Sequence, residues 1–206
     1  MSSPLDAVHA ELLKVGTLPA GWLSVLGIAT LTVAAGTAEP DTPLAAAAYT
    51  QTGFLVLGAQ AATSEYAGGQ IRTTLLAVPR RVEAMAAQAV VLGLTGGVLA
   101  AAVVGAVVAF TPAAATGAAA ATAYLALLTV LAAAVGALLR GPLPSLAGLL
   151  AWFLVVAPLA RGRADWVGWL PDVPRAGDAV HGTAVLLGWT LVLLAVAVAV
   201  VHRRDA

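Results

Sequence analysis

The chain has 206 residues, of which 61% are hydrophobic and 10% are charged, and its mean hydropathy is +0.95. These values lie far outside the range of soluble domains and indicate an integral membrane protein. The ten basic and ten acidic residues cancel, which leaves no basic field to attract nucleic acid, and the lack of cysteine excludes disulfides and thiolate metal sites.

The first expected element is a short amphipathic helix at residues 3–14. Ser3, Pro4 and Asp6 form a pattern typical of a helix start. The leucines and the valine that follow share one face, as in a helix lying on the inner membrane surface. This helix serves either as an anchor or as a contact for a partner, and the sequence does not separate the two.

Six apolar stretches are long enough to cross a hydrocarbon layer of about 30 Å. Each is uninterrupted rather than alternating, and only a helix satisfies its own backbone hydrogen bonds in lipid. The sequence therefore predicts an all-α polytopic protein in which residues 1–206 form one transmembrane domain. The expected spans are Leu18–Gly36, Leu44–Thr63, Met85–Phe110, Thr116–Leu139, Leu143–Ala160 and Gly182–Val201.

Basic residues predict the orientation of these spans, because Lys and Arg accumulate on the cytoplasmic side. With both termini inside, seven of the ten basic residues are cytoplasmic and three are external. The cytoplasmic set is Lys14, Arg72, Arg80, Arg81, Arg140, Arg203 and Arg204, and the external set is Arg161, Arg163 and Arg175. We therefore expect a multi-pass protein of the cell (plasma) membrane with cytoplasmic termini.

A polar and basic segment, Ser64–Arg81, separates the second and third expected spans. Its two adjacent glycines, 68 and 69, should end the second span, and a short amphipathic helix can follow with Ile71, Leu75 and Val78 on one stripe. Pro79 then ends this helix. Held between two spans, such a helix would transmit force from a cytoplasmic partner. An ordinary loop that obeys the positive-inside rule is the alternative.

Other features of the spans and loops are interpreted as packing devices. Gly93, Gly97, Ala101 and Gly105 form a stripe of small residues that favours internal helix packing over a dimer contact. Gln51, Gln60 and Gln88 should turn inward to find hydrogen-bond partners. In the external loop 161–181, Trp166 and Trp169 suit the headgroup region, and Pro158 is expected to kink the fifth span into this loop.

Residues 65–81, EYAGGQIRTTLLAVPRR, resemble the loop after the second span of ATP-binding-cassette (ABC) type-2 permeases. In that family a Glu closes the second span, a Gly-x-Ile-Arg run follows, and Pro-Arg-Arg precedes the third span, especially in high-alanine actinobacterial members. The Glu11–Lys14 start before the first span and a Trp-Leu-Pro segment at 169–171 also agree. One departure is Gln88, where many relatives carry Lys.

The resemblance implies an exporter half: a second permease subunit completes a homodimer, and a separate ABC ATPase subunit binds ATP and Mg. The segment 71–76 would be the coupling helix that this ATPase contacts, and short external helices would cap the exit side between spans five and six. The residues assigned to coupling are Glu65, Gly69, Ile71, Arg72, Leu75, Pro79, Arg80 and Arg81. No catalytic residue, cofactor or metal is expected on this chain. It would not be an enzyme by itself.

Several sequence features favour or disfavour other functions. The only lysine, Lys14, lacks a glycine-rich phosphate loop, so any ATP hydrolysis by that mechanism belongs to another polypeptide. None of the six apolar cores holds an Asp, Glu, Lys, Arg or His, which argues against a proton- or sodium-coupled carrier. An autonomous channel lined by groups such as Gln51, Gln60, Thr95 and Thr129 stays open, as does a non-transporting immunity or assembly protein. The apolar spans suggest an amphipathic or apolar substrate for export.

Overall fold

The computed structural model describes residues 26–28, 30–31, 43–67, 81–110, 117–163, 165–173 and 178–204. Within these ranges every regular element is helical and none is a strand. Four helical segments are long and apolar enough to cross a bilayer: Met85–Ala109, Ala118–Leu139, Pro142–Ala160 and Ala179–Val200. The chain is therefore a multi-pass α-helical membrane protein, as its composition predicts.

The helices follow one another as α3 (Pro43–Ala67), α5 (Arg81–Phe110), α6 (Ala118–Leu139), α7 (Pro142–Leu150), η2 (Ala151–Val156), α8 (Ala157–Ala160), η3 (Asp165–Trp169) and α9 (Ala179–Arg204). η2 is a π-helical segment and η3 is a short 3-10 helix. α7, η2 and α8 are continuous and together form the expected fifth span. η3 is the helix that the structure describes in the loop between the fifth span and α9.

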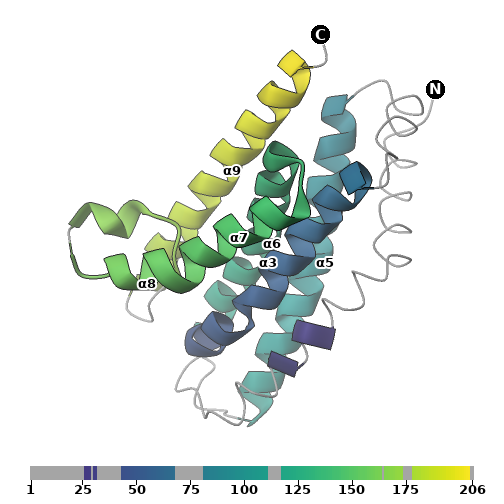
Figure 1. Ribbon diagram of the computed structural model, residues 1–206. Helices are drawn as coiled ribbons and strands as arrows, with labels where there is room; N and C mark the ends of the chain where they lie inside the picture. Colours follow the sequence, from purple (N-terminus) through teal and green to yellow (C-terminus); the bar gives the residue numbers. More distant parts are fainter. Residues whose placement is uncertain are drawn as a thin grey trace.

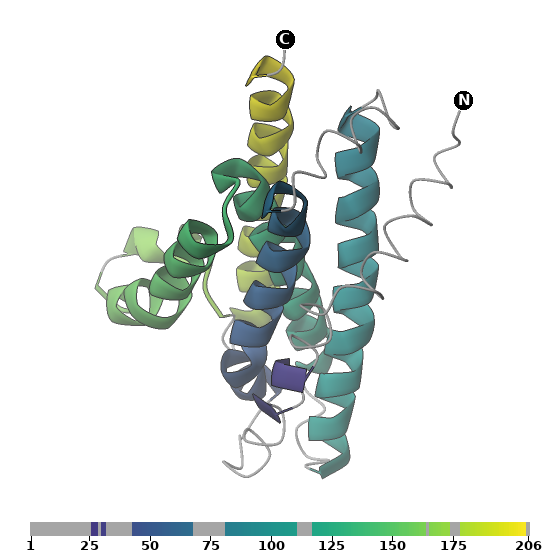
Figure 2. The same ribbon diagram turned by 45° about the vertical axis from the view of Figure 1, so that its right-hand side comes forward.

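The long helices alternate in direction (Figure 1). We call the end of the bundle at which α9 finishes the C-terminal end. α3 runs toward this end, α5 runs away from it, α6 returns, and α7 begins near it. In Figure 1 and in Figure 2, the segment formed by α7, η2 and α8 slants away from the axes of α3, α5 and α6. Residues 161–173 therefore lie away from the C-terminal end.

α3 contains the expected second span, 44–63, yet it is not one of the four helices that meet the criterion for crossing. Gln51, Gln60 and several threonines lower its hydropathy. Gln51, Thr50 and Thr63 are nonetheless buried, because α3 packs chiefly against α6 and also contacts α5 and α7. A helix surrounded by protein needs fewer apolar residues than one that faces lipid.

Two expected elements fall largely outside the described residues. Of the first expected span, 18–36, the structure describes residues 26–28 and 30–31, which are helical. Ile28 is buried and packs into the core. The amphipathic helix expected at 3–14 lies outside the described part of the chain, so it stays a prediction.

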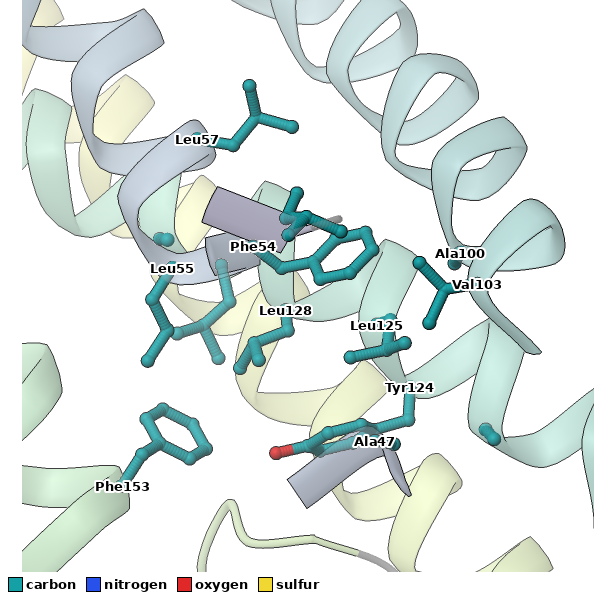
Figure 3. Packing of buried hydrophobic residues seen from close by; sticks show 14 of the residues in the cluster. Ala47, Phe54, Leu55, Leu57, Ala100, Val103, Tyr124, Leu125, Leu128 and Phe153 are labelled. Carbon is teal, nitrogen blue, oxygen red and sulfur yellow. The ribbon is translucent and has the colours of Figure 1, made fainter. Parts of the chain in front are cut away.

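The core is centred on the contact between α3 and α6 (Figure 3). Phe54 and Leu55 from α3 meet Leu125 and Leu128 from α6, and each of these side chains is fully buried. Phe153 points toward the same cluster from η2 (Figure 3). The tilted fifth span is therefore attached to the bundle by an aromatic side chain from its π-helical segment.

The irregularity of the fifth span has a local cause. The amide of Ala157 donates to the carbonyl of Trp152, five residues earlier, which is the hydrogen bond of a π-helix. The next residue, Pro158, has no amide hydrogen, and its ring would crowd the carbonyl of Leu154 in a regular α-helix. The sequence predicts a kink at Pro158, and the structure places the widened turn directly before it.

Candidate functional site

The segment expected to couple to an ATPase joins α3 to α5. Glu65 lies in the last turn of α3, and Arg81 is the first residue of α5. Gly69, Ile71, Arg72, Leu75, Pro79 and Arg80 lie outside the described residues. The structure brings the two ends of this segment to the C-terminal end of the bundle (Figure 1), and the coupling helix between them stays a prediction.

The helix before this segment, α3, is held against α6 by contacts at glycines. A Cβ atom built on Gly58 would lie 2.1 Å from the carbonyl oxygen of Thr129. Two turns further along α6, a Cβ built on Gly136 would lie 3.1 Å from the carbonyl oxygen of Ala59. Only glycine allows two helix backbones to approach this closely. α3 and α6 are therefore packed as one rigid pair.

A buried hydrogen bond crosses between the same two helices. The hydroxyl of Tyr124 on α6 donates to Oε1 of Gln51 on α3 over 2.7 Å, and the two residues are 0% and 4% exposed. The prediction that Gln51 turns inward to find a partner is confirmed. Gln60 and Gln88 are half-buried. The sequence reasoning did not single out Tyr124, although a tyrosine hydroxyl within an apolar span also requires an acceptor.

The buried threonine and serine hydroxyls in the helices are satisfied by the backbone of their own segment. In each case the hydroxyl donates to the backbone carbonyl four residues earlier, over 2.6 to 3.2 Å. The residues are Thr50, Thr63, Thr129, Ser145 and Thr190. Thr129 and Gln51, two of the groups considered for a channel lining, are buried in the core.

The stripe of small residues on α5 is only partly used for packing. Cβ atoms built on Gly93 and Gly97 would lie 3.5 and 3.9 Å from side chains of α6. Ala101 and Gly105 are exposed, and nothing lies within 4 Å of a Cβ on Gly105. The tightest contact comes from Gly96, off the stripe, whose Cβ would lie 2.7 Å from the hydroxyl of Thr129.

The loop that follows the fifth span, expected from the sequence to be external, is held by a bidentate ion pair. Nε and Nη2 of Arg161 donate to the two carboxylate oxygens of Asp172 over 2.5 and 2.6 Å. The hydrogen bond to Asp172 raises the pKa of Arg161 above its usual value. Arg161 therefore stays charged at neutral pH, and the part of the stability that depends on its charge is lost only as the pH rises through this raised pKa.

Tryptophans attach the same loop to the spans below it. Nε1 of Trp152 donates to the carbonyl of Pro171 over 2.9 Å, and Nε1 of Trp189 donates to the carbonyl of Trp169 over 2.8 Å. The ring of Trp169 also contacts His181 edge to face, with ring centroids 5.1 Å apart. The described part of the loop is thus attached to the spans through its backbone carbonyls, and Trp152 and Trp189 are anchors that the sequence reasoning missed.

The chemistry available in the described part of the chain is limited. No group of three His, Asp or Glu side chains there could hold a metal ion. Gln51, Tyr124, the buried threonine and serine hydroxyls and the indole N–H groups of Trp152 and Trp189 are committed to structural hydrogen bonds. Nothing in this arrangement resembles a nucleophile paired with a base.

Comparison of the chain with protein families, curated proteins and solved structures gave no match. Any functional assignment therefore depends on the residues and the geometry of this chain.

Proposed function

We propose that this chain is the membrane-spanning permease subunit of an ABC-type exporter. The subunit has six spans, lies in the plasma membrane with cytoplasmic termini, and pairs with a second copy. A separate ATPase subunit holds ATP and Mg and docks under residues 64–81. The exported molecule is amphipathic or apolar. This chain has no catalytic role of its own.

Two features of the segment 64–81 support the proposal: its sequence and the position of its two ends at one end of the bundle. Its sequence resembles the coupling loop of type-2 permeases. α3 ends and α5 begins at the same end of the bundle as Arg140 and the end of α9 at Arg204 (Figure 1). Basic residues on the short loops at one end favour a cytoplasmic position for that end, where a soluble ATPase would meet the segment.

The packing of α3 supports the mechanical part of the proposal. A coupling helix is useful only if the span it joins moves as a unit. Gly58 and Gly136 bring α3 and α6 into backbone contact, and the hydrogen bond from Tyr124 to Gln51 links them further along. Force applied at the end of α3 would therefore reach α6 instead of being absorbed within α3.

The composition of the spans supports an external energy source. The four described candidate spans hold no Asp, Glu, Lys or Arg, and the one His in them is His181 at the start of α9. A carrier coupled to protons or sodium generally requires a charged or cation-coordinating group at membrane depth. Energy from a partner ATPase removes this requirement.

The proposal is tested by copurification. The tagged chain is extracted from its native membrane in a mild detergent, the accompanying proteins are identified, and ATPase activity is measured. We expect a soluble ABC ATPase to copurify, and we expect Arg72→Ala combined with Leu75→Ala to lower both its recovery and the ATPase activity while membrane insertion is unchanged.

A matched control replaces the same two residue types, one arginine and one leucine, on the side expected to be external. Arg163→Ala combined with Leu159→Ala removes an exposed arginine and an exposed leucine near the external loop, and it should leave the ATPase bound. Recovery of the chain alone would contradict the proposal and favour an autonomous channel or an immunity or assembly protein. Loss of the ATPase in both double variants would show that residues 64–81 are not its specific docking site.

A further inference from the structure

An apolar groove lies between the tilted fifth span and its neighbours, beneath the external loop. Its volume is about 290 Å³. Leu131 and Val135 of α6 form one side, Gly148 and Trp152 of the fifth span form another, and Leu193 of α9 forms a third. Leu170 and Pro171 of the external loop cover one end. Four separate parts of the chain therefore build this groove.

Two tryptophans line the groove, and the indole N–H group of each already donates a hydrogen bond within the protein. The indole N–H of Trp152 donates to the carbonyl of Pro171, a residue that itself lines the groove. The indole N–H of Trp189 donates to the carbonyl of Trp169. The remaining lining side chains are aliphatic or phenyl, apart from Gly148. An occupant would therefore be recognised by shape and apolar contact alone.

The groove lies among helices that are candidate membrane spans, so lipid is expected around it. α6, the fifth span and α9 are three of the four candidate membrane spans. The polar end of the groove is marked by the external loop, where the ion pair of Arg161 with Asp172 lies. Hydrocarbon chains are the surrounding medium at the depth of the spans, and a headgroup would sit at the level of the loop.

The π-helical segment contributes directly to this groove. Trp152 and Phe153 both belong to η2 and both line the groove. Phe153 is also fixed in the core, at 1% exposure. The wider π-helical turn lets the chain bury Phe153 while Trp152 reaches the carbonyl of Pro171. Such segments occur frequently at functional sites, and here the irregular turn shapes an apolar wall.

We propose that this groove is a specific site for one acyl chain of a phospholipid, in the leaflet on the side of the external loop. The chain lies between α6, the fifth span and α9, and the headgroup sits beside the loop. The site is independent of the proposed permease function, because nothing in its recognition involves residues 64–81.

The groove provides a filling variant and a matched control. Gly148 lines the groove and Gly105 lies on α5, and nothing lies within 4 Å of a Cβ built on either glycine. Gly148→Leu therefore adds a side chain at the wall of the groove from a Cβ position that meets no other atom, and Gly105→Leu makes the same change on an exposed face elsewhere. The full-length chain and both variants are purified in detergent, and retained phospholipid is measured by native mass spectrometry.

We expect the unmodified chain and Gly105→Leu to retain a phospholipid through detergent washing, and Gly148→Leu to retain it roughly tenfold less, since a leucine displaces several methylene contacts. Equal retention in all three proteins, or none in the unmodified chain, would overturn the proposal. A change of oligomeric state in Gly148→Leu alone would also overturn it, because the groove would then be an interface between copies.

A second readout covers the case in which Gly148→Leu does not fold. Delipidated protein is titrated with brominated phosphatidylcholine, and tryptophan fluorescence is recorded. Trp152 and Trp189 line the groove, so we expect a saturable quenching component. Leu193→Phe, which enlarges a different wall, should remove that component. Quenching that rises linearly without saturation in the unmodified chain would contradict a specific site.

Discussion

The hydrogen bond between Gln51 and Tyr124 joins two helices through side chains 73 positions apart in the sequence. Both groups are buried, so neither can exchange its partner for water. Double-mutant cycles between membrane helices give about 0.6 kcal/mol per such bond on average and up to about 1.7 kcal/mol. This bond should therefore lie toward the upper part of that range, because the hydroxyl and the amide oxygen are both fully enclosed.

A double-mutant cycle tests this value. We expect Tyr124→Phe and Gln51→Leu each to destabilise the folded protein by about 1 kcal/mol, because each leaves the other partner unsatisfied. The double variant should lose much less than the sum, with a coupling of about 1 to 1.5 kcal/mol. The measurement is reversible unfolding from mild detergent into denaturing detergent. Strictly additive losses would show that the bond contributes no coupling.

At the residue scale, the sequence predicts the need for a bond but not its partner. Gln51 is an amide in an apolar stretch, and its inward orientation follows from the cost of an unsatisfied polar group in lipid. Tyr124 lies on a different helix, and no sequence pattern connects the two positions. The same holds for Trp152 and Trp189, whose acceptors are backbone carbonyls in the external loop.

At the scale of helices, close approach is decided by glycines that face another backbone. The spacing of Gly93, Gly97, Ala101 and Gly105 predicts a packing stripe, but only its first half packs against α6. Gly58 makes a much closer approach, and it belongs to no repeat in the sequence. Spacing identifies which residues share a face, whereas the partner of that face depends on the tertiary arrangement.

We expect Gly58→Ala to destabilise the protein by roughly 1 to 3 kcal/mol, the usual cost of overpacking. The added methyl group would have to displace the α6 backbone at Thr129. Thermal inactivation of the detergent-solubilised protein, followed by size-exclusion chromatography, measures the shift. Gly105→Ala is the control, and it should be neutral or stabilising by up to about 1 kcal/mol through helix propensity. Equal midpoints for the two variants would contradict the backbone contact.

Hydropathy also misjudges one element for a physical reason. Residues of the second expected span are helical in α3, but the α3 sequence is more polar than that of the four candidate spans, so its crossing of the membrane stays a prediction. α3 is enclosed by other helices, so its threonines bond to their own backbone and Gln51 bonds to α6. Hydropathy reports contact with lipid and therefore undervalues a helix at the centre of a bundle.

For the whole molecule, composition alone predicts the helical membrane class, and the five described long segments agree closely with the expected second to sixth spans. Alternating helix directions place the start of α5 and the end of α6 at one end of the bundle and the end of α8 away from it (Figure 1). The docking of a partner ATPase stays a prediction. The proposed docking surface on this chain is made of side chains of residues 68–80, which lie outside the described residues.

The orientation of the whole molecule is tested by labelling single cysteines, since the natural chain contains none. Gly168→Cys reports on the external loop, Asp205→Cys on the C-terminus and Ser2→Cys on the N-terminus. We expect a membrane-impermeant maleimide to label Gly168→Cys in intact cells. The other two variants should react only after permeabilisation, because the positive-inside rule places both termini in the cytoplasm.

A fourth variant distinguishes a cysteine that is unlabelled because it lies within the bilayer from one that is unlabelled because it lies on the inner side of the membrane. Val98 is 71% exposed on α5, in the middle of a candidate span, so Val98→Cys should stay unlabelled by the polar reagent both before and after permeabilisation. Labelling of Asp205→Cys in intact cells, with Gly168→Cys protected, would show the opposite orientation. If Ser2→Cys and Asp205→Cys reacted from opposite sides, the number of spans would be odd. The six-span topology, and with it the cytoplasmic position of residues 64–81, requires both termini to react from inside.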